Sequence, residues 1–243
     1  MGKRRLDALL VDRGLAESPE KARALVMAGQ VTVDERPAPK AGSLVAEDAS
    51  LAVDLGPRYV SRGGEKLEHA LISFGIDVSG LVAADIGAST GGFTDCLLQH
   101  GAKRVYAIDV GRAQLDYKLR GDTRVVSMER VNARDLGSLP EPVDVAAIDV
   151  SFISLRVVLP PVSRLLRRGA PIIALFKPQF EAEKDEVPRG GVIRDAQLHA
   201  ILIGRFASWL VTSGFSIRDL VASPILGAEG NREFLFLLQA DAR

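Results

Sequence analysis

The sequence predicts an α/β protein in two parts: a small N-terminal α+β module over residues 1–55, and a Rossmann-like domain with a seven-stranded mixed sheet over residues 65–243. Two observations predict this division. From residue 81 onward, short apolar runs of strand length alternate with longer segments whose apolar positions recur at helical spacing, which is typical of a doubly wound sheet. The first 55 residues follow another order, with two helical segments before short alternating ones.

The N-terminal module begins with basic residues and three leucines between positions 6 and 10, which predict a short amphipathic helix with a basic start. Ser18 followed by Pro19 is typical of a helix start and predicts a second helix. Alternating residues at 31–33 and 51–53 predict a small sheet.

Residues 56–64 are rich in proline and glycine and are expected to be a linker. Lys66 lies in the first turn of the helix that follows. The helix dipole makes a cation unfavourable in the first turn, so we expect Lys66 to have an acidic partner nearby or a functional role.

The larger domain is expected to alternate strands and helices. The predicted strands are 81–86, 105–109, 125–128, 143–148, 171–176, 217–221 and 234–238, and the predicted helices are 65–74, 93–100, 157–168 and 197–212. Such sheets bind ligands at the carboxyl ends of their parallel strands, where Gly87, Asp109, Asp149 and Lys177 are expected.

Composition limits the function classes. The chain has 243 residues and no formal net charge, so bulk electrostatics do not indicate a nucleic-acid partner. The start lacks a signal peptide's apolar core, and no uncharged apolar run approaches the ~18 residues of a membrane helix. We therefore expect a cytoplasmic enzyme without stable membrane association. The single cysteine, Cys96, falls on the apolar face of a predicted helix and is expected in the core.

The glycine-rich loop after the first strand of the domain indicates a nucleoside cofactor. Ser89 stands where a dinucleotide fingerprint has its middle glycine, and no Lys-Ser or Lys-Thr pair follows as in a P-loop. S-adenosylmethionine carries no phosphate and needs only room beside Gly87 for its amino-acid end. Asp109, at the tip of the next strand, is suited to bind its ribose hydroxyls.

A serine hydrolase is an alternative, because residues 87–91 also fit the Gly-x-Ser-x-Gly nucleophile elbow around Ser89. Asp149 and His199 follow in the required order. Against this reading, only one strand precedes the loop in its domain, no His-Gly-Gly-Gly run offers an oxyanion hole, and Asp109 would have no role.

Two ionisable residues end apolar strands. Burying Asp149 and Lys177 there costs several kcal/mol unless they are paired, so we expect them to pair with each other; the alternative role is a purely structural salt bridge. If the last strand runs antiparallel, Glu233 at its start reaches the same edge. Lys66 would then complete a set of four alternating charges in the order Lys-Asp-Lys-Glu.

The N-terminal module resembles the S-four-type RNA-binding domain. The residues that carry this resemblance are RLDALL (5–10), Gly14-Leu15, Ala22-Arg23, GQVTV (29–33) and Lys40. Ser18-Pro19 departs from the usual Ser-Arg, and Lys21 is expected to replace that phosphate contact. The RNA-binding side chains that the resemblance implies, together with one from the linker, are Lys3, Arg4, Arg5, Arg13, Lys21, Arg23, Lys40 and Arg62. The alternative is that these side chains are merely solvated, since residues 1–62 hold ten basic against nine acidic residues.

Nearly the whole chain resembles the TlyA family. The matching motifs are RYVSRGGEKL (58–67), DIGASTGGFT (85–94), DVSFISL (149–155), FKPQFE (176–181) and GGVIRD (190–195). That family is labelled both hemolysin and ribosomal RNA methyltransferase, and its catalytic domain is similar to FtsJ-type ribose methyltransferases, which are Rossmann-like class I enzymes. The resemblance implies a catalytic tetrad of Lys66, Asp149, Lys177 and Glu233. The expected cofactor-binding residues are Asp85, Gly87, Ala88, Ser89, Gly91, Gly92, Phe93, Asp109, Val110, Asn132, Ala133 and Asp149.

The expected reaction is transfer of a methyl group from S-adenosylmethionine to a ribose 2′-hydroxyl of ribosomal RNA, free or in ribosomal subunits. Lys177 is the candidate base, because a hydroxyl is a poor nucleophile at neutral pH, although orientation alone could supply much of the rate. A membrane-active hemolysin and a non-catalytic RNA-binding factor are the other function classes.

Overall fold

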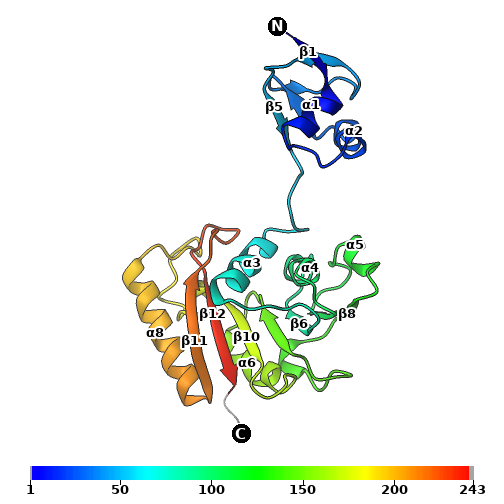
Figure 1. The fold of residues 1–243 in the computed structure, drawn as a ribbon. Helices are drawn as coiled ribbons and strands as arrows, with labels where there is room; N and C mark the ends of the chain where they lie inside the picture. The colour runs from blue at the N-terminus through cyan, green and yellow to red at the C-terminus, as the bar shows by residue number, and fades with distance from the viewer. Residues whose placement is uncertain (1, 241–243) are drawn as a thin grey trace. The chain divides into compact units, whose positions relative to one another are not determined.

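The computed structural model describes residues 2–240, and the chain divides into two compact units, Met1–Arg58 and Tyr59–Arg243 (Figure 1). Residues 59–64, which we expected in the linker, belong to the second unit. Tyr59 is only 2% exposed and packs in the core of that unit. Gly63 and Gly64 already form the first turn of a helix.

The first unit has two helices and short strands. Its elements are β1 (Lys3–Arg5), α1 (Leu6–Asp12), α2 (Pro19–Met27), β2 (Val31–Val33), β3 (Arg36–Pro37), β4 (Leu44–Ala46) and β5 (Leu51–Val53). The two predicted helices are present, and β2 pairs with β5 as expected. The basic start of the first helix is wrong, because residues 3–5 pair with β4 as a strand. Leu6 and Leu10 are fully buried beneath α2 and the sheet.

The second unit contains every predicted strand and long helix. Its elements are α3 (Gly63–Phe74), β6 (Val82–Ile86), α4 (Gly92–Gln99), β7 (Arg104–Asp109), α5 (Tyr117–Arg120), β8 (Val125–Glu129), the 3-10 helix η1 (Ala133–Asp135), β9 (Val145–Ile148), α6 (Leu155–Ser163), β10 (Pro171–Phe176), α7 (Pro178–Glu181), α8 (Ala196–Thr212), β11 (Phe215–Ala222) and β12 (Phe234–Ala240). The short α5, η1 and α7 were not predicted, because three or four residues are too few to show a helical period.

The strands form one seven-stranded mixed sheet in the order β11-β12-β10-β9-β6-β7-β8, as expected. Among the strands of residues 2–240, β12 alone runs opposite to the other six strands of this sheet. Its first residue, Phe234, lies opposite Phe176, the last residue of β10. This register places Glu233 next to Lys177 at the carboxyl edge of the parallel strands.

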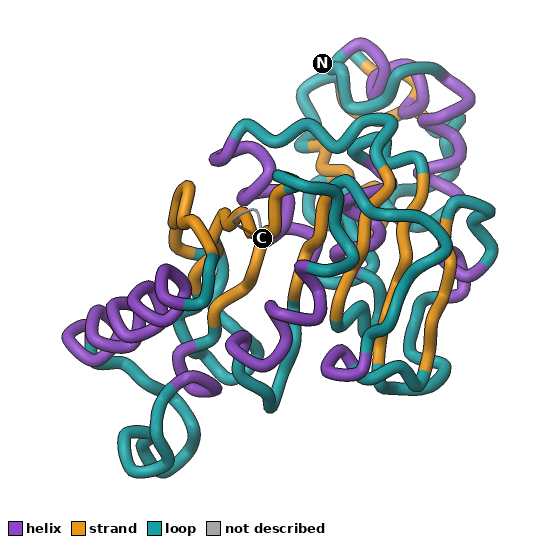
Figure 2. Tube along the Cα trace, turned by 90° about the horizontal axis from the view of Figure 1, so that it is seen from below, coloured by secondary structure: helices purple, strands orange, loops and turns teal. Residues whose placement is uncertain are grey.

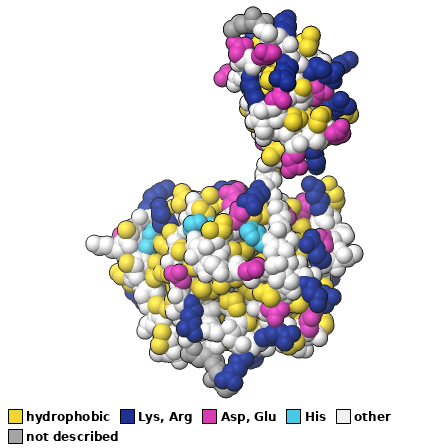
Figure 3. Space-filling view, in the orientation of Figure 1, with side chains coloured by type: hydrophobic (Ala, Val, Ile, Leu, Met, Phe, Trp, Pro, Cys, Tyr) yellow, Lys and Arg dark blue, Asp and Glu magenta, His cyan; other side chains and the backbone are white. Residues whose placement is uncertain are grey.

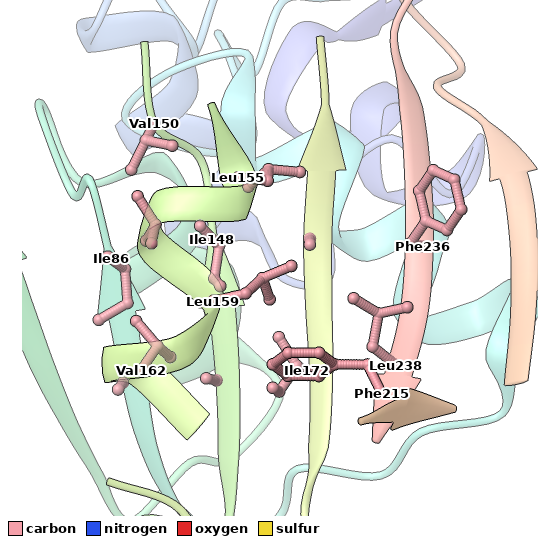
Figure 4. Packing of buried hydrophobic residues seen from close by; sticks show 14 of the residues in the cluster. Ile86, Ile148, Val150, Leu155, Leu159, Val162, Ile172, Phe215, Phe236 and Leu238 are labelled. Carbon is pink, nitrogen blue, oxygen red and sulfur yellow. The ribbon is translucent and has the colours of Figure 1, made fainter. Parts of the chain in front are cut away.

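Helices cover both faces of the sheet (Figure 2). On one face, Leu155, Leu159 and Val162 of α6 pack on β6, β9 and β10 (Figure 4), and α8 extends the same core. On the other face, α3 and α4 pack together, and Cys96 is fully buried among them. Alternate residues of each strand therefore enter different cores, as the two-residue period of a strand requires. Within residues 2–240, no helix combines the length and the apolarity needed to cross a membrane.

Candidate active site

Four charged residues from distant parts of the sequence line one cavity of about 440 Å³, here called the charged cavity. Lys66 comes from α3, Asp149 from the end of β9, Lys177 from the end of β10, and Glu233 from the start of β12. They meet because the carboxyl ends of the parallel strands share an edge with the amino end of β12. The structure thus brings together all four residues of the expected tetrad.

The four charges form two ion pairs. Lys177 Nζ lies 2.7 Å from Asp149 Oδ1, and Lys66 Nζ lies 2.5 Å from Glu233 Oε2. Lys177 also donates a hydrogen bond of 2.9 Å to Ser151 Oγ. Both lysines and Glu233 are less than 10% exposed, so this pairing offsets the cost of taking their charges out of water. The partner acid expected for Lys66 is Glu233.

An aromatic wall lies beside the charges, and the sequence alone did not single it out. Phe152 lines the charged cavity, is 88% exposed and has a φ of +62°, a left-handed conformation that is costly for an aromatic residue. Its ring centroid lies 5.1 Å from that of Phe180. Such strain concentrates at functional sites. Gln179 and Ser151 also line this cavity. Two signals in the sequence pointed to these four residues: their place just after a strand end, and their membership of the motifs DVSFISL (149–155) and FKPQFE (176–181).

A second cavity of about 520 Å³, here called the loop cavity, adjoins the first. Seven of the expected cofactor-binding residues line it: Gly87, Ser89, Asp109, Val110, Asn132, Ala133 and Asp149. Gly87, Ser89, Asp149, Ser151 and Phe152 line both cavities. A group held in the loop cavity can therefore reach a group held in the charged cavity.

Gly87 lies in the wall of the loop cavity and packs closely against the end of β9. This residue has a φ of +85°, and a Cβ there would lie 2.3 Å from the carbonyl oxygen of Asp149. The backbone N–H of Asp149 is itself tied to the carbonyl of Ile86 at 2.9 Å, so the two strand ends cannot separate easily. Only glycine lets the loop approach the backbone at the end of β9 this closely.

Asp109 fastens the glycine-rich loop. Its Oδ2 accepts the backbone N–H of Ser89 at 2.8 Å, and its Oδ1 accepts that of Gly111 at 2.6 Å. An ionised carboxylate has about four acceptor sites, so two remain for ribose hydroxyls.

The other expected cofactor residues lie elsewhere. Ala88, Gly92 and Phe93 line the charged cavity, whereas Asp85 and Gly91 line neither cavity. A Cβ at Gly91 would lie 2.2 Å from Leu119, so this glycine supports the loop by close packing. Because neither residue lines a cavity, this geometry does not support the direct cofactor contacts expected of Asp85 and Gly91.

Asp85 is fully buried beneath the loop. Its Oδ2 accepts the Thr94 hydroxyl at 2.6 Å, while its Oδ1 has no hydrogen bond to any described residue. Burial raises the pKa of Asp85 from 3.8 to about 7, and the hydrogen bond from Thr94 only partly opposes this shift.

Asp85→Asn should remove a pH dependence of stability. The native Asp85 holds a proton that the unfolded chain releases, so its contribution to the free energy of unfolding falls as pH rises from 3.8 to about 7 and then stays constant. The slope is at most about 1.4 kcal/mol per pH unit. Urea unfolding of both proteins at several pH values between 4.5 and 8 should show a difference that grows with pH up to about 7. Parallel curves would contradict the buried, protonated carboxyl.

Many basic residues expected to bind RNA already have partners within the first unit. Asp7 is only 2% exposed and accepts hydrogen bonds from Arg5 at 2.7 Å and from Arg23 at 3.2 Å. These bonds, above all those from Arg5, hold the pKa of the Asp7 carboxyl well below its usual range. Arg4 pairs with Asp12 at 2.7 Å, and Arg13 donates to two backbone carbonyls. These bonds orient the guanidinium groups without burying them.

The remaining basic residues of the expected set are Lys3, Lys21 and Lys40, all exposed on the first unit, and Arg62, which lines the charged cavity of the second. Over the visible face of the first unit, Lys and Arg side chains alternate with Asp and Glu (Figure 3). The basic side chains on that face are therefore interspersed with acidic ones and do not form one continuous patch.

The hydrolase triad is not formed. Ser89 is exposed with a φ of +49°, as a nucleophile elbow would require, but His199 lies in the core. The His199 ring Nε2 lies 3.1 Å from the carbonyl oxygen of Ile193, and the ring packs against Phe234. His199 lines neither cavity, so it cannot act as a base for Ser89.

A seven-stranded sheet with an antiparallel β12, a glycine-rich loop after β6 and an acid after β7 define the class of S-adenosylmethionine-dependent α/β methyltransferases. The chain belongs to the FtsJ-like methyltransferase family, whose model matches residues 59–240, and an S4 domain model matches residues 4–50. These matches confirm the two-part fold and the resemblance on which the expected cofactor rests.

Proteins that are similar over nearly the whole chain support the same family assignment. A Bacillus subtilis protein labelled as the rRNA methyltransferase YqxC is 49% identical, over 97% of this chain and 85% of its own length. The 16S/23S rRNA (cytidine-2′-O)-methyltransferase TlyA of Mycobacterium tuberculosis is 45% identical, over 97% of this chain and 89% of its own. A solved structure from Streptococcus thermophilus with a hemolysin label is 43% identical with a TM-score of 0.74, over 99% of this chain and 90% of its own. The chain is thus an enzyme of the methyltransferase class, and the hemolysin name is a secondary label among its relatives.

Proposed function

We propose that this chain transfers a methyl group from S-adenosylmethionine to a ribose 2′-hydroxyl of ribosomal RNA. The observation that carries this proposal is the junction of the two cavities at Gly87 and Asp149, where a buried Lys177 of the charged cavity pairs with Asp149. The names of the relatives, rRNA (cytidine-2′-O)-methyltransferase among them, support the substrate. An enzyme that acts on ribosomes would work in the cytoplasm.

The loop cavity would hold the cofactor. Asp109 would accept its ribose hydroxyls, Val110, Asn132 and Ala133 would contact its base, and Gly87 would leave room for its amino-acid end. When bound, S-adenosylmethionine supplies an electrophilic methyl group on a sulfonium centre.

The charged cavity would hold the acceptor nucleotide. After release of one ammonium proton to solvent, the neutral Nζ of Lys177 would bind the 2′-hydroxyl and take its proton as the oxygen attacks. Asp149 and Ser151 fix this Nζ by contacts of 2.7 and 2.9 Å, so the amine is held in place before the RNA arrives. Lys66, held by Glu233, would add positive charge near the developing alkoxide.

Mapping of ribosomal RNA tests the proposed function directly. Mass spectrometry of nuclease digests from cells with and without the gene should show a 2′-O-methylated nucleotide that is present only with the gene. Purified protein and tritiated cofactor should restore this mark on RNA from the deletion strain. Unchanged RNA in both experiments would contradict the proposal.

The first unit is proposed to dock the RNA, so its removal should separate RNA binding from cofactor binding. Deleting residues 1–58 keeps the whole second unit, and cofactor affinity measured by calorimetry should be unchanged. RNA affinity should fall, and the slope of log affinity against log salt should become shallower, because phosphate contacts by lysine and arginine are lost. A truncated protein that binds and methylates ribosomal RNA like the full chain would rule out the docking role.

A further inference from the structure

Glu181 of α7 is a buried acid that lines neither the charged cavity nor the loop cavity. Only 2% of its side chain is exposed. Its Oε2 accepts the Ser154 hydroxyl at 2.7 Å, and its Oε1 accepts the backbone N–H of Leu155 at 2.6 Å. Burial raises the pKa of Glu181, and these two hydrogen bonds oppose the rise. The buried carboxylate therefore ties two distant segments of the chain together.

The segment that Glu181 binds is the β9 loop, defined as residues 149–154, which carries two side chains of the charged cavity. Ser151 accepts a hydrogen bond of 2.9 Å from Lys177 Nζ, and Phe152 has the strained φ of +62°. None of residues 150–153 pairs its backbone with that of another described residue. The order of the β9 loop therefore depends on its side-chain contacts.

α7 contacts the β9 loop at successive points along both segments. In chain order these contacts join Lys177 to Asp149 and Ser151, Phe180 to Phe152, and Glu181 to Ser154 and Leu155. The first contact sets the position of the Lys177 amine, and the last one fastens the far end of the loop. Glu181 can thus keep Ser151 against Lys177 although it lies outside both cavities.

We propose that Glu181 is a positioning residue for methyl transfer, which acts through the β9 loop by keeping Ser151 beside the Lys177 amine. A neutral lysine amine has two N–H groups and one lone pair, and two oxygens, Asp149 Oδ1 and Ser151 Oγ, lie 2.7 and 2.9 Å from Nζ. When the N–H groups face these oxygens, the lone pair is left for the acceptor hydroxyl. Without Ser151 in place, the amine turns about its last bond and its lone pair faces the hydroxyl less often. The inference rests on the proposed function, because it takes Lys177 to be the base.

Glu181→Ala tests this role through the single-turnover rate at saturating ribosomal RNA and S-adenosylmethionine. The rate should fall by about 10- to 100-fold, because a misplacement of about 1 Å can cost 100-fold. Glu181→Gln should keep most of the rate, since its Oε1 can accept the Leu155 N–H and its Nε2 can donate to the Ser154 hydroxyl. Glu183→Ala, at an exposed position two residues further on, is the matched control and should have the wild-type rate.

A double-mutant cycle separates positioning from a merely structural role. Ser151→Ala alone should lower the rate by about 10-fold. If Glu181 acts through Ser151, adding Glu181→Ala to Ser151→Ala should lower the rate by less than about 3-fold further, because the two changes remove the same contact. A general loss of structure would not depend on Ser151, and the two effects on the rate would multiply.

Thermal melting of each variant sets an assay temperature at which all of them are folded. If Glu181→Ala does not fold, Ser154→Ala takes its place in the cycle, because it removes one of the same hydrogen bonds from the loop side.

The outcomes distinguish this inference from the proposed function. A wild-type rate in folded Glu181→Ala, effects that multiply in the cycle, or a Glu181→Gln as slow as Glu181→Ala would overturn the positioning role alone. A wild-type protein that methylates no ribosomal RNA would overturn the proposed function and this inference together.

Discussion

Lys177→Ala should lower methyl transfer to ribosomal RNA by about 10²- to 10⁴-fold, the range typical of a lost general base. Its affinity for S-adenosylmethionine should stay near the wild-type value, because Lys177 lines the charged cavity and not the loop cavity. Single-turnover rates with tritiated cofactor and calorimetry measure the two quantities separately. Ser89→Ala should affect the rate far less, since His199, the base of the hydrolase alternative, lies in the core.

Folding must be followed in the same proteins. Removing one partner of a fully buried ion pair costs about 3–5 kcal/mol, and the loss here should be smaller because the Asp149 side chain is 22% exposed. Thermal melting gives this cost, and Lys184→Ala, at an exposed position shortly after α7, is a matched control that should change neither stability nor rate. A folded Lys177→Ala with the wild-type rate would eliminate the mechanism.

Lys177→Arg distinguishes a base from a group that only orients the hydroxyl. Arginine keeps the positive charge and can pair with Asp149, but it does not give up its proton in proteins. If Lys177 takes the proton, this variant should be as slow as Lys177→Ala. Substantial activity in Lys177→Arg would instead assign Lys177 to orientation and charge stabilisation.

The sheet and its charged residues were predictable because both follow from short-range patterns. Apolar runs define the strands, and an ion at the end of such a run must find a partner, so the pairing of Asp149 with Lys177 follows from burial cost alone. The pairing of Lys66 with Glu233 needed one more assumption, the antiparallel direction of the last strand, which the register of Phe234 with Phe176 satisfies.

Other features depend on tertiary contacts that the local sequence does not encode. Residues 3–5 have no strand signal of their own and become a strand only because β4 lies beside them. Asp85 precedes the glycine-rich loop directly, yet it faces Thr94 of α4 instead of a cavity. The exposed ring of Phe152 and the unpaired amide of Gln179 are visible only once two strand-end loops are brought together.

Asp109→Ala should weaken the binding of S-adenosylmethionine by about 10- to 100-fold, because hydrogen bonds to a charged acceptor are worth about 1.5–3 kcal/mol each. The change also frees the backbone N–H groups of Ser89 and Gly111, so the loop should lose part of its order. Asp109→Asn keeps one acceptor oxygen and should give an intermediate affinity in calorimetry.

Asp77→Ala is the matched control for Asp109→Ala. Asp77 is exposed and accepts a backbone N–H from Ser79 at 2.8 Å, so it makes the same kind of turn contact while lining neither cavity. This variant should bind the cofactor like the wild type. If Asp109→Ala also binds like the wild type while melting normally, then Asp109 only fastens the loop, and the ribose must be held by another residue of the loop cavity. Asn132 would be the first to test, because it lines the loop cavity and its side-chain oxygen, which accepts the N–H of Arg134 at 3.0 Å, has a second acceptor site.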